Sequence, residues 1–156
     1  MGPPCAPANP GPENAMHPIL LDGPMGTELA RRGVDTPAPG WSAWALERAP
    51  DVVAAIHADY AAAGATVHTV NSFRTQPRWF PDTWRALVHR AVTLARRAVP
   101  ETHRIAGSIA PLEDCYSPWL SPPDPRPEHR QLARALAAEG VDLLLVETFP
   151  HVGEGL

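Results

Sequence analysis

The stretch EHRQLARALAAEGVDLLLVE, residues 128–147, contains the pattern that decides the fold. Its first part carries Leu132 and Leu136 on one helical face and stops at Gly140, which is typical of an amphipathic helix with a C-terminal glycine. A short and largely apolar run, residues 141–146, follows directly. A run of this length and composition predicts a strand that is buried on both faces, as in a parallel sheet.

The same alternation recurs along the rest of the chain. Two further helices are predicted: one over residues 51–63 that stops at Gly64, and one after Asp82, a possible N-cap, that ends before Pro100. Alternating strands and helices imply right-handed crossovers between parallel strands, so we expect an α/β fold. The expected strands are Ile19–Leu21, Ala65–Val70, Ile105–Ala106 and Val141–Val146.

Length and composition are those of one folded domain. The chain has 156 residues, fewer than the roughly 250 that are typical of a complete eight-unit α/β barrel. Hydrophobic residues make up 44% and charged residues 19%, which is sufficient for a core. Residues 1–18 are rich in Pro and Gly, so they are predicted to form a disordered tail before a domain over residues 19–156.

Charge, cysteine content and hydropathy exclude several classes of partner. The net charge is −4 and the basic residues are scattered, so no nucleic acid is expected as a partner. The two cysteines, Cys5 and Cys115, do not make a disulfide framework. No apolar run approaches the ~20 residues of a membrane span, and the N-terminus lacks a signal-peptide pattern. We therefore expect a cytoplasmic protein that binds no membrane.

Three polar residues directly follow predicted strands, where the working groups of a parallel α/β sheet lie. They are Asp22, Asn71 and Glu147. Each also has a structural interpretation. Asp22 could cap the loop or the helix that begins near Thr27, Asn71 could cap a strand end, and Glu147 could belong to a structural ion pair, since a carboxylate is costly to bury alone.

The histidines do not indicate a metal site by their spacing. No two of His57, His68, His89 and His151 make a helical i, i+4 pair or a short ligand pair on one strand. We interpret them as packing or surface residues.

The sequence LDGPMGTEL, residues 21–29, followed by Arg32-Gly33, resembles the opening motif of the homocysteine S-methyltransferase family. Further segments resemble the family's successive blocks in the same order, from about Ile19 to the last residue. These segments are Trp41–Ala43, His57–Tyr60 through Gly64-Ala65, Thr69–Thr75, Ala106–Pro111 with Asp114–Tyr116, and Gly140–Asp142 through Glu147–Phe149. The chain is thus similar to the N-terminal half of the family's homocysteine-binding domain.

The resemblance implies a (β/α)8 TIM barrel, of which this chain holds about the first four β/α units. In the family, homocysteine lies at the carboxyl edge of the barrel, with its amino group held by acidic residues, and Asp22 and Glu147 stand at the matching positions. The backbone from Gly23 to Gly26 would donate N–H groups to the substrate carboxylate, although Pro24 has none to give. The substrate-binding residues implied are Asp22, Gly23, Met25, Asn71 and Glu147.

The family's cofactor is Zn²⁺, which three cysteines hold and which converts the homocysteine thiol to a thiolate. Those cysteines belong to the second half of the barrel, and this sequence stops before them. Cys115 lies in a block where the family does not use cysteine as a ligand, so we interpret it as structural. The chain alone is therefore expected neither to hold stoichiometric zinc nor to transfer methyl groups.

The leading hypothesis is a homocysteine S-methyltransferase chain whose complete form moves a methyl group from a sulfonium-type donor to homocysteine and makes methionine. The sulfonium donor is favoured because no second domain for folate or cobalamin is present. One alternative is a truncated, non-catalytic fragment. Another is a half-barrel that needs a complementing C-terminal half or self-association, because an open half exposes strand edges and apolar surface.

Overall fold

The computed structural model describes residues 18–155, so the predicted tail over residues 1–18 lies almost entirely outside the described part. Short 3-10 helices (η) accompany the α-helices and strands. The elements in chain order are α1 (Met25–Arg31), η2 (Trp41–Trp44), α2 (Ala45–Arg48), α3 (Pro50–Ala62), β1 (Val67–Thr69), α4 (Trp84–Ala98), β2 (Arg104–Ile109), η3 (Pro118–Leu120), α5 (Arg126–Ala138), β3 (Leu143–Val146) and α6 (Val152–Gly155).

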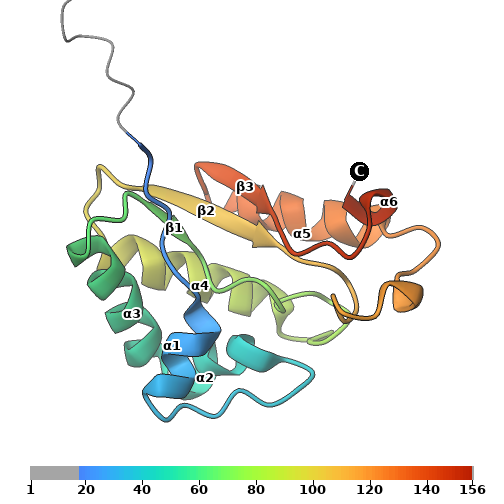
Figure 1. Ribbon diagram of the computed structural model, residues 1–156, viewed down its shortest axis with the longest axis horizontal. Coiled ribbons are helices and arrows are strands. Elements are labelled where there is room, and N and C mark those ends of the chain that lie inside the picture. The colour runs from blue at the N-terminus through green and yellow to red at the C-terminus, as the bar shows by residue number, and fades with distance from the viewer. Residues whose placement is uncertain (1–17, 156) are drawn as a thin grey trace, which may run out of the picture.

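The three strands form one parallel sheet in the order β1-β2-β3, and Figure 1 shows them side by side with α4 and α5 running alongside. Val67 pairs with Arg104 at one end, and Ile109 pairs with Val146 at the other. Helix α4 connects β1 to β2, and α5 connects β2 to β3. The predicted α/β fold with parallel strands is therefore confirmed.

The first predicted strand is wrong in extent. Of Ile19–Leu21, only Leu21 makes a ladder contact, an isolated parallel bridge to Val67. The backbone carbonyl of Leu20 accepts hydrogen bonds from the N–H groups of Thr66 and Val67, so the segment lies beside β1 without forming a regular strand. The run has only three apolar residues, and Pro24, which has no N–H to donate, comes soon after it and directly before α1.

Burial on both faces was predicted for all the strands, and it is wrong for the two outer segments. Ile19 is 70% exposed in the first segment, and Val146 is 53% exposed in β3. The central strand β2 is buried from Ile105 to Ile109. The central strand β2 is packed against by both α4 and α5, whereas β3 lies at the edge of the described sheet, where less of the chain covers it.

The glycine stops predicted for two helices are confirmed. Gly64 follows α3 with φ +103°, and Gly140 follows α5 with φ +76°, a backbone region that favours glycine. Asp82 is not the N-cap of α4, because the helix begins one residue later than expected, with Thr83 at the N-cap position. The preceding residues form a turn in which the N–H of Trp84 bonds to the carbonyl of Phe80.

The core lies between β2 and the helices that cover it. Helix α4 buries the face predicted from its spacing, and α5 buries Leu132 and Leu136. Gly107 of β2 lies so close to α5 that a Cβ there would be 3.0 Å from Leu136 Cδ1. No helix among residues 18–155 has the length and apolar character that crossing a membrane requires.

Candidate functional site

A cavity of about 710 Å³ lies where β1, β2 and β3 end and their following loops begin. Asp22, Gly23, Met25, Asn71 and Glu147, the residues implied as substrate-binding, all line it. The other lining residues are Leu21, Pro24, Gly26, Thr27, Thr36, Trp41, Ser42, Thr69, Val70, Phe73, Ser108 and Leu145. The structure thus brings the five residues together, and their contacts with a substrate stay a prediction.

Asp22 is held by the end of β1. Its Oδ2 accepts a hydrogen bond from the N–H of Thr69 at 3.0 Å, and its side chain is 4% exposed. Burial raises the pKa of Asp22 to about 6; the Thr69 hydrogen bond opposes this shift, and the nearby charge of Glu147 adds to it. The alternative that Asp22 caps the following helix is wrong, because the N-cap of α1 is Pro24 and no side chain caps it.

Glu147 follows the edge strand β3 and points back toward β2. Its Oε1 accepts a hydrogen bond from the hydroxyl of Ser108 at 2.5 Å, and its backbone N–H bonds to the carbonyl of Ile109. Ser108 also lines the cavity. Within residues 18–155 no basic side chain forms an ion pair with Glu147, so the alternative of a structural ion pair finds no support there.

Asn71 and Gly23 shape the cavity wall. The amide Nδ2 of Asn71 donates to the backbone carbonyl of Ser42 at 2.8 Å, which ties the segment after β1 to η2. Gly23 is required by a close approach, because a Cβ at this position would lie 2.6 Å from the hydroxyl oxygen of Tyr60. This contact gives the glycine of the opening motif a steric reason that is independent of any ligand.

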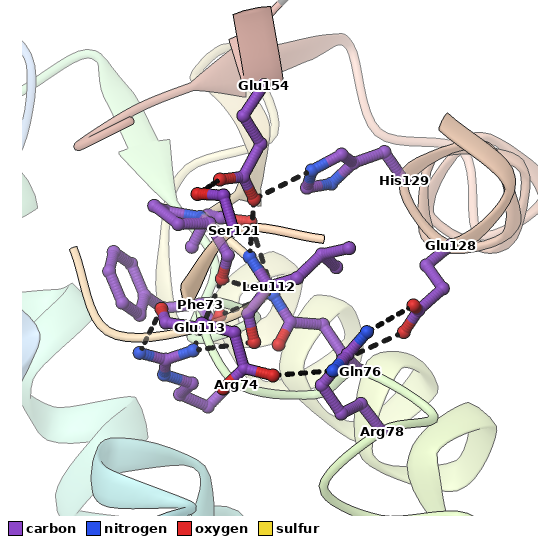
Figure 2. Close-up of polar contacts among 12 residues, drawn as sticks. Phe73, Arg74, Gln76, Arg78, Leu112, Glu113, Ser121, Glu128, His129 and Glu154 are labelled. Carbon is purple, nitrogen blue, oxygen red and sulfur yellow. Dashed lines mark hydrogen bonds and ion pairs between the residues drawn. The ribbon is translucent and has the colours of Figure 1, made fainter. Parts of the chain in front are cut away.

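The loops after β1 and β2 are fastened to each other by buried side chains (Figure 2). The guanidinium of Arg74 is buried and donates to the carbonyls of Pro111 and Glu113 at 3.2 and 2.9 Å. It also lies over the ring of Trp41, 4.4 Å from the ring centroid. Gln76 donates to the carbonyl of Ala110 at 3.2 Å. These contacts hold the cavity rim in one shape, and because the acceptors are backbone carbonyls, no residue pattern in the sequence indicates them.

A second set of contacts extends this network to the end of the described chain (Figure 2). Arg78 bridges Glu113 and Glu128, joining the loop after β2 to α5. Glu154 of α6 is buried and accepts hydrogen bonds from the Leu112 N–H at 2.8 Å and from the Ser121 hydroxyl. Sequence reasoning assigned no role to Glu154.

The histidines divide into two groups. His89 and His151 are exposed, as surface residues are, whereas His57 of α3 and His68 of β1 are fully buried. This burial fits the predicted packing and surface roles, but ligand-type atoms of Asp22, His57 and His68 also lie within 4.8 Å of one another. The three residues come from different elements, so their spacing along the chain carries no sign of this cluster.

A zinc-thiolate site does not fit the described residues. Cys115 is the free cysteine of residues 18–155, it is half-buried in the loop after β2, and it does not line the cavity. Three thiolates around one metal ion would need cysteines from outside this part of the chain.

Comparison with known proteins agrees with this geometry. The model of the family described as Homocysteine S-methyltransferase matches residues 19–155. The chain belongs to the homocysteine S-methyltransferase family. The family's opening motif contributes Asp22, Gly23 and Met25 to the cavity wall, and the segment after the last described strand contributes Glu147.

Similar family members are bacterial and plant proteins. The homocysteine S-methyltransferase of Escherichia coli K12 is 31% identical, with 87% of this chain and 51% of that protein covered. Homocysteine S-methyltransferase YbgG of Bacillus subtilis is 30% identical over similar shares, and selenocysteine methyltransferase of Astragalus bisulcatus is 28% identical. The chain therefore spans about half the length of the curated relatives it matches.

A solved structure of a family member resembles this chain over about the same part of its length. The metallated form of the Escherichia coli homocysteine methyltransferase MmuM superposes with a TM-score of 0.76 and 31% identity, with 89% of this chain and 57% of that chain covered. The fold described above matches about half of that protein.

Proposed function

We propose that this chain supplies the amino-acid-binding half of a homocysteine S-methyltransferase, and that the complete (β/α)8 barrel transfers a methyl group to homocysteine to give methionine. The observation that carries this proposal is the pair of carboxylates, Asp22 and Glu147, that line one cavity at the carboxyl edge of the sheet. Family membership and the likeness to the methyltransferase of Escherichia coli support it.

The charge balance of the cavity favours a cationic group on the ligand. Glu147 raises the pKa of Asp22 further than burial alone does, so the two negative charges oppose each other, and no basic side chain of the described residues pairs with Glu147. An ammonium group between them relieves this repulsion and gains charge-assisted hydrogen bonds. The pair would thus select an α-amino acid over a simple thiol.

The remaining lining groups suit the rest of homocysteine. The first-turn N–H groups of α1, at Met25 and Gly26, have no acceptor within the helix and are available to a carboxylate, while Pro24 offers none. Met25, Phe73 and Leu145 provide apolar contacts for the side-chain methylenes.

The reacting sulfur requires groups that the described residues do not provide. A free thiol is mostly protonated at neutral pH, so the attack on a methyl group depends on a thiolate. The similar Escherichia coli enzyme MmuM has a metallated form, which supports a role for a metal ion in this step. Because no set of cysteines in residues 18–155 fits that metal, we assign methyl transfer to the complete barrel. We propose a sulfonium compound as its methyl donor.

An exposed sheet edge favours a complementing second half. Leu144 and Val146 of β3 are 41% and 53% exposed on an edge strand, where a further strand would pair and a further helix would cover them. A separately made C-terminal half of a family barrel would supply both, together with cysteines for zinc.

Methionine formation tests this proposal. The purified chain is assayed with homocysteine and a sulfonium donor, first alone and then mixed with a separately made C-terminal half that carries the family cysteines. We expect methionine only in the mixture, and less of it when the Glu147→Gln variant replaces the native chain. Turnover by the chain alone, or a mixture in which the native chain and the Glu147→Gln variant form methionine equally fast at low homocysteine concentration, would contradict the assignment.

A further inference from the structure

Three ligand-type atoms converge beneath the cavity described above. The Nδ1 atom of His57 lies 3.8 Å from Asp22 Oδ2, and the Nδ1 atom of His68 lies 4.0 Å from the same oxygen. All three atoms lie within 4.8 Å of one another. They come from α3, β1 and the segment before α1, so the packing of three elements creates the cluster.

Three of the four imidazole nitrogens of His57 and His68 are buried without a hydrogen-bond partner among the described residues. Both histidines have a relative exposure of 0%, and neither nitrogen of His57 nor Nδ1 of His68 has a partner among the described residues. A buried polar atom without a partner costs about 1–3 kcal/mol, so a folded protein normally satisfies such atoms. Two of these unsatisfied nitrogens face the Asp22 carboxylate, which indicates that something binds between them.

The surroundings favour neutral imidazoles beside a carboxylate. Burial lowers the pKa of His57 to about 4, and burial together with His103 lowers the pKa of His68 against an opposing contribution from the Ala65 backbone. Neutral imidazole is the form that coordinates metal ions. His68 Nε2 lies 3.0 Å from His103 Nδ1, and donation from Nε2 to His103 leaves the lone pair of His68 on Nδ1, toward Asp22.

We propose that Asp22 Oδ2, His57 Nδ1 and His68 Nδ1 bind one divalent transition-metal ion of the Zn²⁺ class. Two imidazoles and one carboxylate form a common ligand set for such ions, and three protein ligands leave a position open for solvent. Ligand atoms around tetrahedral zinc are roughly 3.4 Å apart. We expect small side-chain rotations on metal binding to shorten the observed separations, 3.8 and 4.0 Å to Asp22 Oδ2, to that value. Asp22 also lines the cavity, so we expect solvent to reach the open position from that side.

This site is separate from the zinc-thiolate chemistry of the complete barrel, because it uses no cysteine. It also revises the sequence-based expectation that the chain alone holds no stoichiometric zinc. The two proposals share Asp22, but the metal titration below contains no homocysteine, so failure of the metal site and failure of the proposed function are distinguishable.

Metal titration of the full 156-residue chain tests the proposal. After treatment with EDTA and removal of the chelator, ZnCl₂ is titrated by calorimetry and CoCl₂ by visible spectroscopy, with no homocysteine present. We expect one Zn²⁺ per chain, and a Co²⁺ complex with d–d absorption but without a thiolate charge-transfer band. His57→Gln and His68→Gln should each weaken Zn²⁺ binding at least about tenfold, the lower end of what loss of even a supporting group costs.

Matched controls distinguish the cluster from adventitious sites. His89→Gln removes an exposed histidine, and a Cys5→Ser/Cys115→Ser double variant removes both thiols, so both proteins should bind Zn²⁺ as the native chain does. Because the buried variants could unfold, the imidazole ¹⁵N resonances of the native chain provide a second measurement, in which Zn²⁺ should shift the His57 and His68 signals. No Zn²⁺ binding would overturn the proposal. Binding that the control substitutions remove, while the His57 and His68 variants and resonances do not respond, would also overturn it.

Discussion

Among residues 18–155, the carboxylate of Glu147 has one hydrogen-bond partner, the hydroxyl of Ser108 at 2.5 Å, and it lines the cavity. A carboxylate that is held in this way keeps lone pairs for a ligand, whereas one in a structural ion pair does not. The side chain of Asp22, by contrast, is almost completely buried against Thr69 and the histidines. At the scale of single residues, Glu147 is therefore the more accessible of the two acids for a ligand ammonium group.

Replacing Glu147 by Gln should weaken homocysteine binding by about 1.5–3 kcal/mol, because the substitution removes a charge-assisted hydrogen bond and keeps the shape of the side chain. Calorimetric titration with homocysteine in EDTA measures the effect. Glu101→Gln, which alters an exposed glutamate outside the cavity, is the matched control and should change nothing. An equal dissociation constant for the native chain and Glu147→Gln would assign Glu147 a structural role.

Gly23→Ala should destabilise the fold by about 1–3 kcal/mol, because the added methyl group overlaps the ring of Tyr60, whose hydroxyl would lie 2.6 Å away. Thermal unfolding followed by circular dichroism measures the loss. In a Tyr60→Ala background the same substitution should cost much less, since the overlapping ring is gone. Equal losses of stability in the two backgrounds would show that the close approach of Tyr60 is not the reason for a glycine at position 23.

At the scale of elements, the loop after β2 depends on α6 for part of its support. Burial by itself would raise the pKa of Glu154, but the Ser121 hydroxyl, the Leu112 N–H and His129 outweigh it and lower this pKa below its ordinary value of 4.5. A lowered pKa means that the ionised form stabilises the fold. This stabilisation is present above pH 4.5 and is lost as the pH falls through the folded-state pKa.

Glu154→Gln should therefore lower the free energy of unfolding at pH 7 by about 1–3 kcal/mol, and by progressively less as the pH falls below 4.5. Urea unfolding at a series of pH values gives this difference. Glu101→Gln serves again as the exposed control. A difference that is the same at pH 7 and at a pH about one unit below 4.5 would mean that ionisation of Glu154 does not stabilise the loop.

The elements that sequence predicted best are those with a strong periodic pattern and a glycine stop. Helix α3 begins within one residue of the expected position, and the apolar run at residues 141–146 contains β3. Ile19–Leu21 was too short for apolar character alone to distinguish a strand from an extended segment beside a sheet. Asp82 and Thr83 are both ordinary N-cap residues, so composition could not decide between them.

The part of the candidate site that follows from the order of parallel strands could be predicted from the sequence. Polar residues after parallel strands converge at one edge, and this rule placed Asp22, Asn71 and Glu147 around a single cavity. The histidine cluster and the Arg74 contacts depend on how helices and loops pack in three dimensions, and they join residues or carbonyls that are far apart in sequence. Such contacts cannot be predicted from patterns of neighbouring residues in the sequence.

At the scale of the whole molecule, the described residues place the groups that line the cavity on an open parallel sheet. The cavity lies at the carboxyl edge, the rim is fastened by buried contacts, and the edge strand β3 remains available for a further strand. Family membership and the match to about half of the Escherichia coli structure agree with this division of an enzyme into parts. Under the proposed function, the amino-acid pocket and the zinc-thiolate chemistry belong to different segments of the barrel.

The central claim is that the cavity recognises the α-amino group of homocysteine. Calorimetry in EDTA, with the chain and its complementing half, should compare homocysteine with 4-mercaptobutanoate, which is the same molecule without the amino group. We predict binding of homocysteine at least about tenfold tighter for the native chain, a factor that corresponds to about 1.4 kcal/mol, and a much smaller preference for Glu147→Gln. Equal affinities of the native chain for the two compounds would contradict the account.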